Sequence, residues 1–414
     1  MRTHLLKLSD VRAAVQLVTH ATKGLIDVTE GVHHAVHRSI GLGGAAPDGR
    51  TSGVTGLVYR QIHASHQWLG QGVGRVLSAV LPPASPEGVT DALASDAPER
   101  EAVVSALNGV CGDRLLALHN PLALRMQVRL QHHTLWLEGD TGAARLPILR
   151  PSPHVLLLVH GLCMNDRQWS QQGHDHGAYL ADLLGCTPLY LRYNTGEHIS
   201  TNGDRLSALL ETVVQQWPVP VQSLRVVTHS MGGLVARSAC HAATQAGQTW
   251  VRRLSHLVFL GTPHHGAPLE QAGAWVDSVL GHTPLFSRYA APFAALGRVR
   301  SAGIMDLRHG DLTAADWQAR QPAHHFTDAR QPLPLPVGVA CYTAAARLSP
   351  QQGGLADRWL GDGLVPLPSA LGQHSDPCRQ LAIPPSQQRV LCNLGHIGLL
   401  GSRDVAEQLG VWLV

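Results

Sequence analysis

The stretch that decides the fold of this chain is the run Val226-Val227-Thr228-His229-Ser230-Met231-Gly232-Gly233-Leu234-Val235-Ala236-Arg237. In this run, β-branched residues are followed by a turn of small residues and then directly by a sequence that favours a helix. This order places Ser230 on a sharp bend between a strand and a helix, with its hydroxyl exposed and the helix N-terminus behind it. The stretch therefore predicts a serine held in position for chemistry.

Strands and helices are predicted to alternate on both sides of this bend. The continuous apolar run at residues 154–159 is typical of a strand buried on both faces. Further strands are predicted at residues 188–192, 224–228, 254–260, 336–342 and 389–392, and helices at residues 204–217, 231–246 and 404–413. Alternation of this kind predicts an α/β fold with a mainly parallel sheet flanked by helices. A hairpin is predicted before it, at residues 126–137.

Two runs downstream of Ser230 contain the partners that a serine nucleophile needs. A serine hydroxyl reacts at neutral pH only beside a base, and the base needs an orienting carboxylate. Asp362 lies between two glycines, and His396 lies just after the last predicted strand and before the last helix. Both fall on loops at the carboxyl ends of strands, where sites in open α/β sheets lie. Ser230, Asp362 and His396 are therefore the predicted catalytic residues.

Simpler interpretations of these residues exist. Gly-Asp-Gly is also good turn chemistry, so Asp362 is open to interpretation as a turn residue. Asp357 competes as the acid, but it lacks the flanking glycines. His374 competes as the base, but it lies in a polar loop with no strand directly before it.

Acyl transfer at a serine also needs hydrogen-bond donors for the developing oxyanion. The backbone N–H groups of Met231 and Leu162 are the predicted donors, because Met231 follows the serine and Leu162 follows the buried strand at residues 154–159. His160, Tyr193 and His229 are predicted to line the substrate site, and their simpler interpretation is as turn residues or structural neighbours of the bend.

Together these residues resemble the α/β-hydrolase superfamily, and more narrowly its bacterial lipase and esterase branch. The bend at Ser230 is similar to the G-x-S-x-G nucleophile elbow, with Thr228 in place of the first glycine. Residues 160–162 resemble the oxyanion loop of bacterial lipases. Residues 261–266 resemble a segment that triacylglycerol lipase-like enzymes share with GPI inositol-deacylase-like hydrolases, and residues 362–365 resemble the acid motif of these enzymes. The resemblance covers residues 121–414.

The resemblance implies a serine hydrolase that cleaves carboxylic esters through an acyl-enzyme on Ser230, and it implies no cofactor. A hydrophobic ester is the expected substrate. No metal site is expected, since Gly398, two positions after His396, has no side chain to bind the calcium found in some secreted relatives. Two alternatives stay open: an acyltransferase that uses the same triad, and a membrane- or granule-associated binding protein with a hydrolase fold.

The domain organisation follows from changes in pattern along the chain. Residues 1–118 carry amphipathic stripes and are predicted to form a helical N-terminal extension, whose third helix covers residues 98–110. Residues 119–414 are predicted to form the catalytic domain, in which residues 266–330 form an inserted lid. The N-terminal helices are open to three roles: docking on the catalytic domain, self-association, or peripheral binding to a membrane.

Composition excludes several classes of function. The net charge of +3, without a basic run interleaved with aromatics, argues against nucleic-acid binding. The seven cysteines are widely spaced and contain no C-x-x-C, which argues against a disulfide framework or a zinc site. No secretory signal and no apolar run of about 18 residues is present. A cytoplasmic protein, with peripheral membrane binding as the alternative, is the expectation.

Overall fold

The computed structural model describes residues 98–135, 150–171, 173–267, 300–320, 328, 330–350 and 361–414. The helices predicted before residue 98 and most of the predicted lid lie outside these residues, as does the competing acid Asp357.

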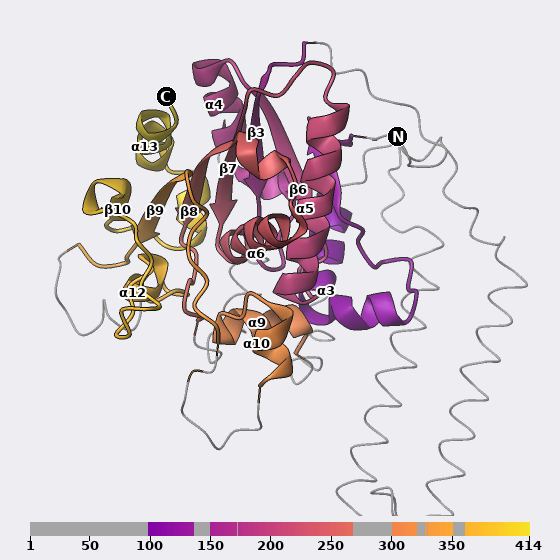
Figure 1. The fold of residues 1–414 in the computed structure, drawn as a ribbon, viewed down its shortest axis with the longest axis vertical. Helices are drawn as coiled ribbons and strands as arrows, with labels where there is room; N and C mark the ends of the chain where they lie inside the picture. The colour runs from indigo at the N-terminus through magenta and orange to yellow at the C-terminus, as the bar shows by residue number, and fades with distance from the viewer. Residues whose placement is uncertain are drawn as a thin grey trace, which may run out of the picture. The chain divides into compact units, whose positions relative to one another are not determined.

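Eight strands of the described residues form one mixed sheet, in the order β10-β9-β8-β7-β3-β6-β1-β2 (Figure 1). The strands are β1 (Gln127–Leu130), β2 (His133–Thr134), β3 (His154–Val159), β6 (Thr187–Arg192), β7 (Ser223–His229), β8 (Leu254–Leu260), β9 (Ala340–Ala346) and β10 (Gln388–Leu391). The strands from β3 to β10 in this sheet pair in parallel, whereas β1 runs antiparallel to both β6 and β2. The predicted mainly parallel sheet and its leading hairpin are confirmed.

Helices cover both faces of the sheet. The α-helices are α3 (Pro98–Ala117), α4 (His176–Leu184), α5 (Ile199–Gln216), α6 (Met231–Ala246), α9 (Ala302–His309), α10 (Ala314–Gln318), α12 (Leu367–Ala370) and α13 (Arg403–Leu413). Short 3-10 turns and a small hairpin complete the described elements: η1 (Asp166–Trp169), η2 (Trp250–Arg253), η4 (Pro385–Gln387), η5 (Ile397–Leu400), β4 (Ser170–Gln171) and β5 (His174–Asp175).

The connections explain this layering. The chain moves from β3 through α4 to β6 in one direction, and from β6 through α5 back to β7 in the other. Because such crossovers are right-handed, α4 lies on the opposite face from α5 and α6. Helix α13 packs against α4, and α5 packs against α6. The connections that leave the adjacent strands β3 and β7 therefore lead in opposite directions along the sheet. Open α/β sheets bind ligands at the carboxyl ends of such a pair of strands.

The core follows the apolar runs of the sequence. From Val155 to Val159, each residue of β3 is at most 1% exposed, as expected of a strand with helices on both faces. Helix α4 is capped at its start by Asp175, whose carboxylate accepts from the N–H of Ala178 at 2.9 Å, and at its end by Gly185 with φ of 59°.

Several elements differ from the sequence-based prediction, among them helices α9, α10 and α12, which were not predicted. Strand β9 lies four residues later than predicted, because Val337 is fully exposed in a turn and the chain enters the sheet only at Ala340. Helix α5 begins at Ile199, five residues before the predicted start. Helix α4 was not predicted.

Helix α3 confirms the third predicted N-terminal helix, which kinks at Cys111, just after its predicted end, and then continues to Ala117. The sequence analysis placed this helix in an extension of residues 1–118. In the structure, α3 belongs to the same compact unit as the described residues from 123 onward. The helix therefore packs with the predicted catalytic domain, and its own role has to be considered with that domain.

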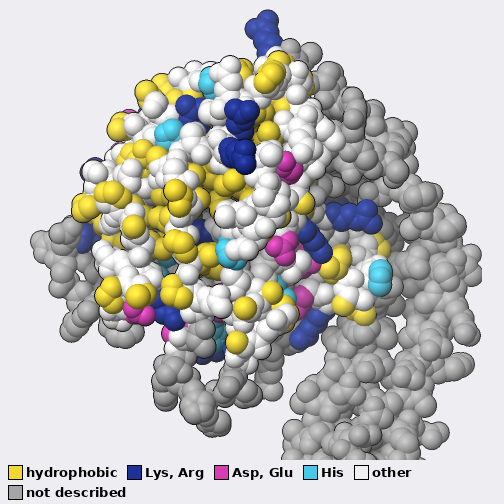
Figure 2. Space-filling view, in the orientation of Figure 1, with side chains coloured by type: hydrophobic (Ala, Val, Ile, Leu, Met, Phe, Trp, Pro, Cys, Tyr) yellow, Lys and Arg dark blue, Asp and Glu magenta, His cyan; other side chains and the backbone are white. Residues whose placement is uncertain are grey.

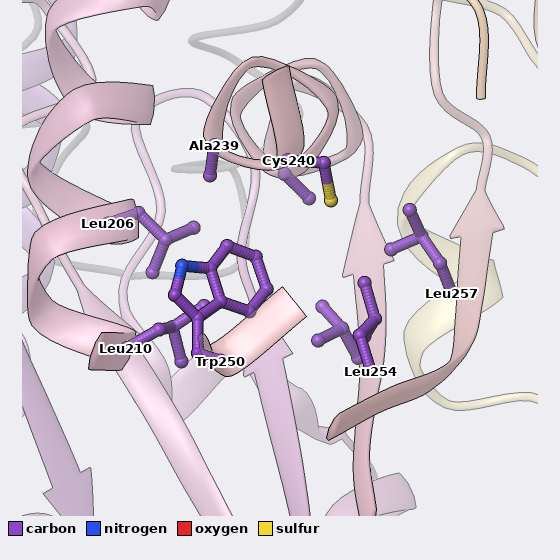
Figure 3. Close-up of a pocket in the computed structure, with 9 residues that line it drawn as sticks. Leu206, Leu210, Ala239, Cys240, Trp250, Leu254 and Leu257 are labelled. Atoms are coloured by element: carbon purple, nitrogen blue, oxygen red, sulfur yellow. The ribbon is translucent and has the colours of Figure 1, made fainter. Parts of the chain in front are cut away.

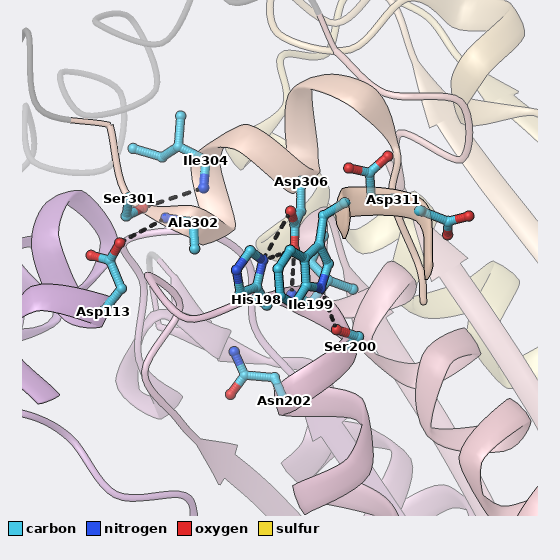
Figure 4. A network of polar contacts seen from close by, with 12 residues as sticks. Asp113, His198, Ile199, Ser200, Asn202, Ser301, Ala302, Ile304, Asp306 and Asp311 are labelled. Carbon is cyan, nitrogen blue, oxygen red and sulfur yellow. Dashed lines mark hydrogen bonds and ion pairs between the residues drawn. The ribbon is translucent and has the colours of Figure 1, made fainter. Parts of the chain in front are cut away.

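The described part of the predicted lid is held to the body of the unit (Figure 4). The buried carboxylate of Asp306 in α9 accepts from the N–H of Ile199 at 2.9 Å, and it lies 3.0 Å from Nδ1 of His198. The ring of Trp317 stacks on His198, and its indole N–H donates to Ser200 at 3.1 Å. Helices α9 and α10 are thus anchored at the start of α5.

Apolar side chains also line a small pocket between α5, α6 and β8 (Figure 3). Leu206 and Leu210 contribute from α5, Cys240 from α6, and the indole of Trp250 fills the centre. No polar catalytic group lines it, so we interpret this pocket as a small gap in the packing of the hydrophobic core.

The face shown in Figure 2 carries Lys and Arg in small separate groups among hydrophobic and uncharged side chains. Among the helices of the described residues, none is both long and apolar enough to cross a membrane.

Candidate active site

Ser230 lies at the junction of β7 and α6. Its φ of 57° and ψ of −127° fall where non-glycine residues are strained, as a sharp strand-to-helix bend requires. The N–H of Ser230 donates to the carbonyl of Leu260 in the neighbouring strand at 2.8 Å, which fixes the bend to the sheet. The serine is fully buried, whereas the sequence analysis expected an exposed hydroxyl.

Thr228 stands at the position of the first elbow glycine. Its side chain is fully buried, and its hydroxyl donates to the carbonyl of Val258 in β8 at 2.9 Å. The hydroxyl of this residue therefore points to the next strand, and the bend accommodates a β-branched residue within the buried sheet.

Asp362 and His396 form a direct pair. Oδ2 of Asp362 lies 2.7 Å from Nδ1 of His396, and the N–H of His396 donates to the carbonyl of Asp362 at 3.1 Å. The other carboxylate oxygen accepts from the N–H groups of Leu364 and Val365 at 3.0 and 2.8 Å. The turn after β9 thus aims one carboxylate oxygen at the imidazole, and the competing His374 instead packs its ring against His265.

The serine and the histidine lie at the same edge of the sheet. The ring of His229, the residue before Ser230, lies 4.6 Å from the ring of His396, and its Nε2 is 3.1 Å from the carbonyl of His396. A Cβ on Gly261 would lie 3.1 Å from Nδ1 and Cε1 of the same imidazole. Asp362 and His396 are thus bonded to each other, and the contact of His229 with His396 places Ser230 at the same edge of the sheet, where Oγ of Ser230 makes no hydrogen bond to the described residues.

The predicted oxyanion donors flank this serine. Met231 is the first residue of α6, and the N–H groups of a helix's first turn have no partner within the helix. Leu162 follows β3, whose last residue pairs with Thr228 at the end of β7. A Cβ on Gly161 would lie 2.9 Å from Cβ and 3.2 Å from Oγ of Ser230, so the loop carrying Leu162 passes directly beside this serine.

The three residues predicted to line the substrate site are all buried in the loop framework. The rings of His160 and Tyr193 stack at 4.5 Å, and the Tyr193 hydroxyl donates to the carbonyl of His160 at 2.9 Å. Burial lowers the pKa of His160 to about 4. Burial and the adjacent His396 hold the pKa of His229 well below its ordinary value, so both histidines are neutral at neutral pH. Their contact with a substrate stays a prediction.

Residues 150–329 match the protein family described as PGAP1-like alpha/beta domain. Together with the sheet order and the serine bend, this match supports assignment to the α/β-hydrolase superfamily. The chain carries an α/β-hydrolase domain. The resemblance drawn from the sequence to lipase- and esterase-like α/β-hydrolases is thereby confirmed.

Solved structures with similar folds include several lipases and esterases. The mature lipase BlEst2 of Bacillus licheniformis is 18% identical, with a TM-score of 0.41 over 64% of this chain and 94% of that chain. The esterase Pf2001 of Pyrococcus furiosus is 13% identical, with a TM-score of 0.35 over 63% of this chain and 83% of that chain. The phospholipase PlaB of Legionella pneumophila is 14% identical, with a TM-score of 0.40 over 63% and 59%. No curated protein matches the sequence significantly.

Sequence analysis missed the residues that support this α/β-hydrolase site from outside. Glu101 of α3 is fully buried and accepts from Nη1 of Arg129 at 2.9 Å and Nη1 of Arg192 at 2.8 Å. The sequence contained one signal for this cluster: Arg129 and Arg192 stand in the predicted strands. A buried cation requires a buried anionic partner, so these arginines indicate a buried carboxylate nearby. Within the described residues, no group of three His, Cys, Asp or Glu side chains is placed to hold a metal ion.

Proposed function

We propose that this α/β-hydrolase domain cleaves carboxylic esters, with Ser230 as nucleophile, His396 as general base and Asp362 as its orienting carboxylate. The observation that carries the proposal is the buried 2.7 Å contact between Asp362 and His396, set at the sheet edge where Ser230 occupies its strained bend. A buried carboxylate bonded to Nδ1 leaves Nε2 of the imidazole as the atom that exchanges a proton with the serine.

In the acylation step, Oγ of Ser230 attacks the ester carbonyl carbon while His396 takes the hydroxyl proton. The carbonyl oxygen becomes an oxyanion that accepts from the N–H groups of Leu162 and Met231. Collapse of this tetrahedral intermediate breaks the bond to the alkoxy oxygen, which leaves as an alcohol after taking the proton from His396.

In the deacylation step, water attacks the acyl carbon and gives a proton to His396. The second tetrahedral intermediate uses the same two donors, and its collapse returns the proton to Oγ of Ser230 and releases the carboxylic acid. Asp362 holds the imidazole in one tautomer and stabilises its charged form in both steps, without itself taking the proton.

The surroundings of Ser230 support a hydrophobic ester as substrate. The serine is fully buried, and the side chains of Leu162 and Met231 beside it are apolar and at most 2% exposed. A charged group would lose its hydration there without a compensating partner, whereas an acyl chain would not.

Hydrolysis of p-nitrophenyl esters, from acetate to palmitate, by the wild type and by Ser230→Ala tests the proposal. We expect turnover by the wild type and loss of at least about 10⁴-fold in kcat in the variant. A variant that retains wild-type turnover, or a wild type that cleaves none of these esters, contradicts the proposal. Product analysis with an added alcohol separates hydrolysis from acyl transfer, because only transfer yields a new ester.

A further inference from the structure

The loop that carries the proposed oxyanion donor Leu162 is held from two sides. On one side lies the segment after β6, where the hydroxyl of Tyr193 donates to the carbonyl of His160 at 2.9 Å. The hydroxyl of Thr195 in the same segment accepts from the N–H of Cys163 at 3.1 Å. This side fixes the residues directly before and after the Gly161–Leu162 pair.

On the other side lies α3. A Cβ on Gly109 would lie 2.9 Å from the Cα and 3.0 Å from the N of Cys163, and closer still to its sulfur. Real Cβ atoms essentially never approach heavy atoms that closely, so only glycine lets the helix pass this near to the loop. Two residues further on, Nδ2 of Asn165 donates to the hydroxyl of Ser105 at 3.3 Å.

A buried charge cluster holds α3 against this loop. Glu101 accepts from Arg129, Arg167 and Arg192, and Arg167 belongs to the turn that directly follows the loop. Asp166 of the same turn lies 3.1 Å from Nη1 of Arg129. Burial alone would raise the pKa of Asp166, but the bond from His132 and the charges of the arginines hold that pKa below its usual range.

The far side of α3 is tied as well. The hydroxyl of Ser301 donates to the carbonyl of Gly109 at 2.6 Å, and the carboxylate of Asp113 accepts from the N–H of Ala302 at 3.1 Å (Figure 4). Helix α3 is therefore packed between the loop of Leu162 and the start of α9, with polar bonds on both sides.

We propose that α3 is a positioning element of the active site, in which the contact of Gly109 with Cys163 sets the direction of the Leu162 N–H. This inference rests on the proposed ester hydrolysis and deepens it. The Leu162 N–H belongs to the planar peptide unit of Gly161 and Leu162, which meets the unit of Leu162 and Cys163 at the Cα of Leu162. A displaced Cys163 backbone therefore shifts this Cα and with it the donor. A misplacement of about 1 Å in such groups costs on the order of 100-fold in rate.

The experiment compares Gly109→Ala with Gly410→Ala in the full-length chain. Both glycines lie inside helices, and a Cβ on Gly410 would also approach within 2.9 Å of an atom, but that atom is the end of the half-exposed Leu183 side chain. The control therefore carries the same change at a site that can relax. The readouts are kcat and KM on the best p-nitrophenyl ester, binding of a trifluoromethyl ketone that forms a tetrahedral oxyanion, and amide hydrogen exchange of residues 160–166.

We expect Gly109→Ala to lower kcat by about tenfold to a hundredfold, with KM within about threefold, and to weaken ketone binding by a similar factor as kcat/KM. Exchange in residues 160–166 should rise in this variant alone. Unchanged kcat and unchanged exchange in a folded Gly109→Ala overturn the inference. If Gly109→Ala shows faster exchange but the wild type cleaves no ester, the positioning role of α3 is supported and the proposed function is contradicted.

A second variant covers the case in which Gly109→Ala fails to fold. Ser105→Ala adds no atom and removes only the bond to Asn165. We expect a loss of a few-fold in kcat, on the order of the free energy of one hydrogen bond, with faster exchange in residues 160–166 and an unchanged KM. Wild-type values for both kcat and exchange in Ser105→Ala would contradict the positioning role of α3.

Discussion

Asp362 and His396 are joined at 2.7 Å although 34 residues separate them, and both side chains are at most 2% exposed. Two backbone N–H groups occupy the second carboxylate oxygen, so the first has the imidazole as its partner. The pair is therefore rigid, and its geometry is set by the turn between two glycines after β9.

Replacing the carboxylate tests this arrangement. In Asp362→Asn, an amide of the same shape loses the charge and favours the wrong tautomer of His396, so we expect kcat to fall by about 10³–10⁴-fold with little change in KM. Steady-state kinetics on a p-nitrophenyl ester checks this. Asp376→Asn, at a carboxylate whose side chain is 47% exposed, is the matched control and should keep wild-type kcat. Equal activity of the two variants would rule out the role of Asp362.

The close approach of Gly161 to Ser230 gives a second prediction. A Cβ at residue 161 would press on the nucleophile at 2.9 Å, so Gly161→Ala should lower kcat by at least about tenfold while the protein stays folded. Gly395→Ala is the control, because its Cβ meets its nearest atoms at 3.6 and 3.8 Å, which is ordinary contact. Near-ultraviolet circular dichroism confirms folding of both. Wild-type turnover in Gly161→Ala would contradict the geometry of this loop.

Thr228 gives a prediction about stability. Thr228→Val keeps the buried shape and removes the hydroxyl that donates to the carbonyl of Val258, so the free energy of unfolding should fall by about 1 kcal/mol. Urea denaturation measures this change. Because the hydroxyl faces β8 and not the serine, kcat should stay within about twofold. A large loss of kcat at unchanged stability would instead place the Thr228 hydroxyl in the chemistry.

The buried histidines predict how stability depends on pH. Burial lowers the pKa of both His160 and His176 to about 4, from an ordinary value of 6.5. Between these values the unfolded chain binds protons that the folded chain does not, so the free energy of unfolding rises with pH across this window. Each residue contributes at most about 3 kcal/mol to this rise.

Urea denaturation between pH 4 and 7 measures that slope. Stability should fall as the pH drops below about 6.5, and His176→Asn should flatten the slope while lowering stability at neutral pH. His176 is suited to the test because its hydrogen bonds within the described residues are to His174 and the carbonyl of Leu399, and none of them is to Ser230, Asp362 or His396. A slope identical to that of the wild type would show that His176 titrates normally in the folded protein.

The sequence predicted the elements whose signals are local. The bend at Ser230 lies where expected, and α6 matches its predicted bounds, because β-branched residues, small residues and helix formers follow one another there. Strand β9 was displaced because its sequence, ACYTAAA, is small and weakly β-forming, and only its neighbours β8 and β10 make it a strand. Its position depends on tertiary contacts that no local pattern encodes.

The candidate site also contains residues that local motifs predict and residues that only tertiary contacts reveal. Ser230, Asp362 and His396 stand in short motifs, and the structure places them at one edge of the sheet. The support from α3 could not be predicted, because the bond from Asn165 to Ser105 spans 60 residues and Gly109 carries no side chain to mark its role. The amphipathic pattern of α3 does not show these contacts, and docking on the catalytic domain was one of three roles left open for the N-terminal helices.

The most direct test of the central claim is the site of covalent labelling by a fluorophosphonate, located by peptide mass spectrometry. The account predicts one adduct, on Oγ of Ser230, which disappears in Ser230→Ala and slows strongly in His396→Gln. An unlabelled Ser230 in a folded wild type, or ester hydrolysis by a protein labelled only at another residue, would contradict the assignment of Ser230 as the nucleophile.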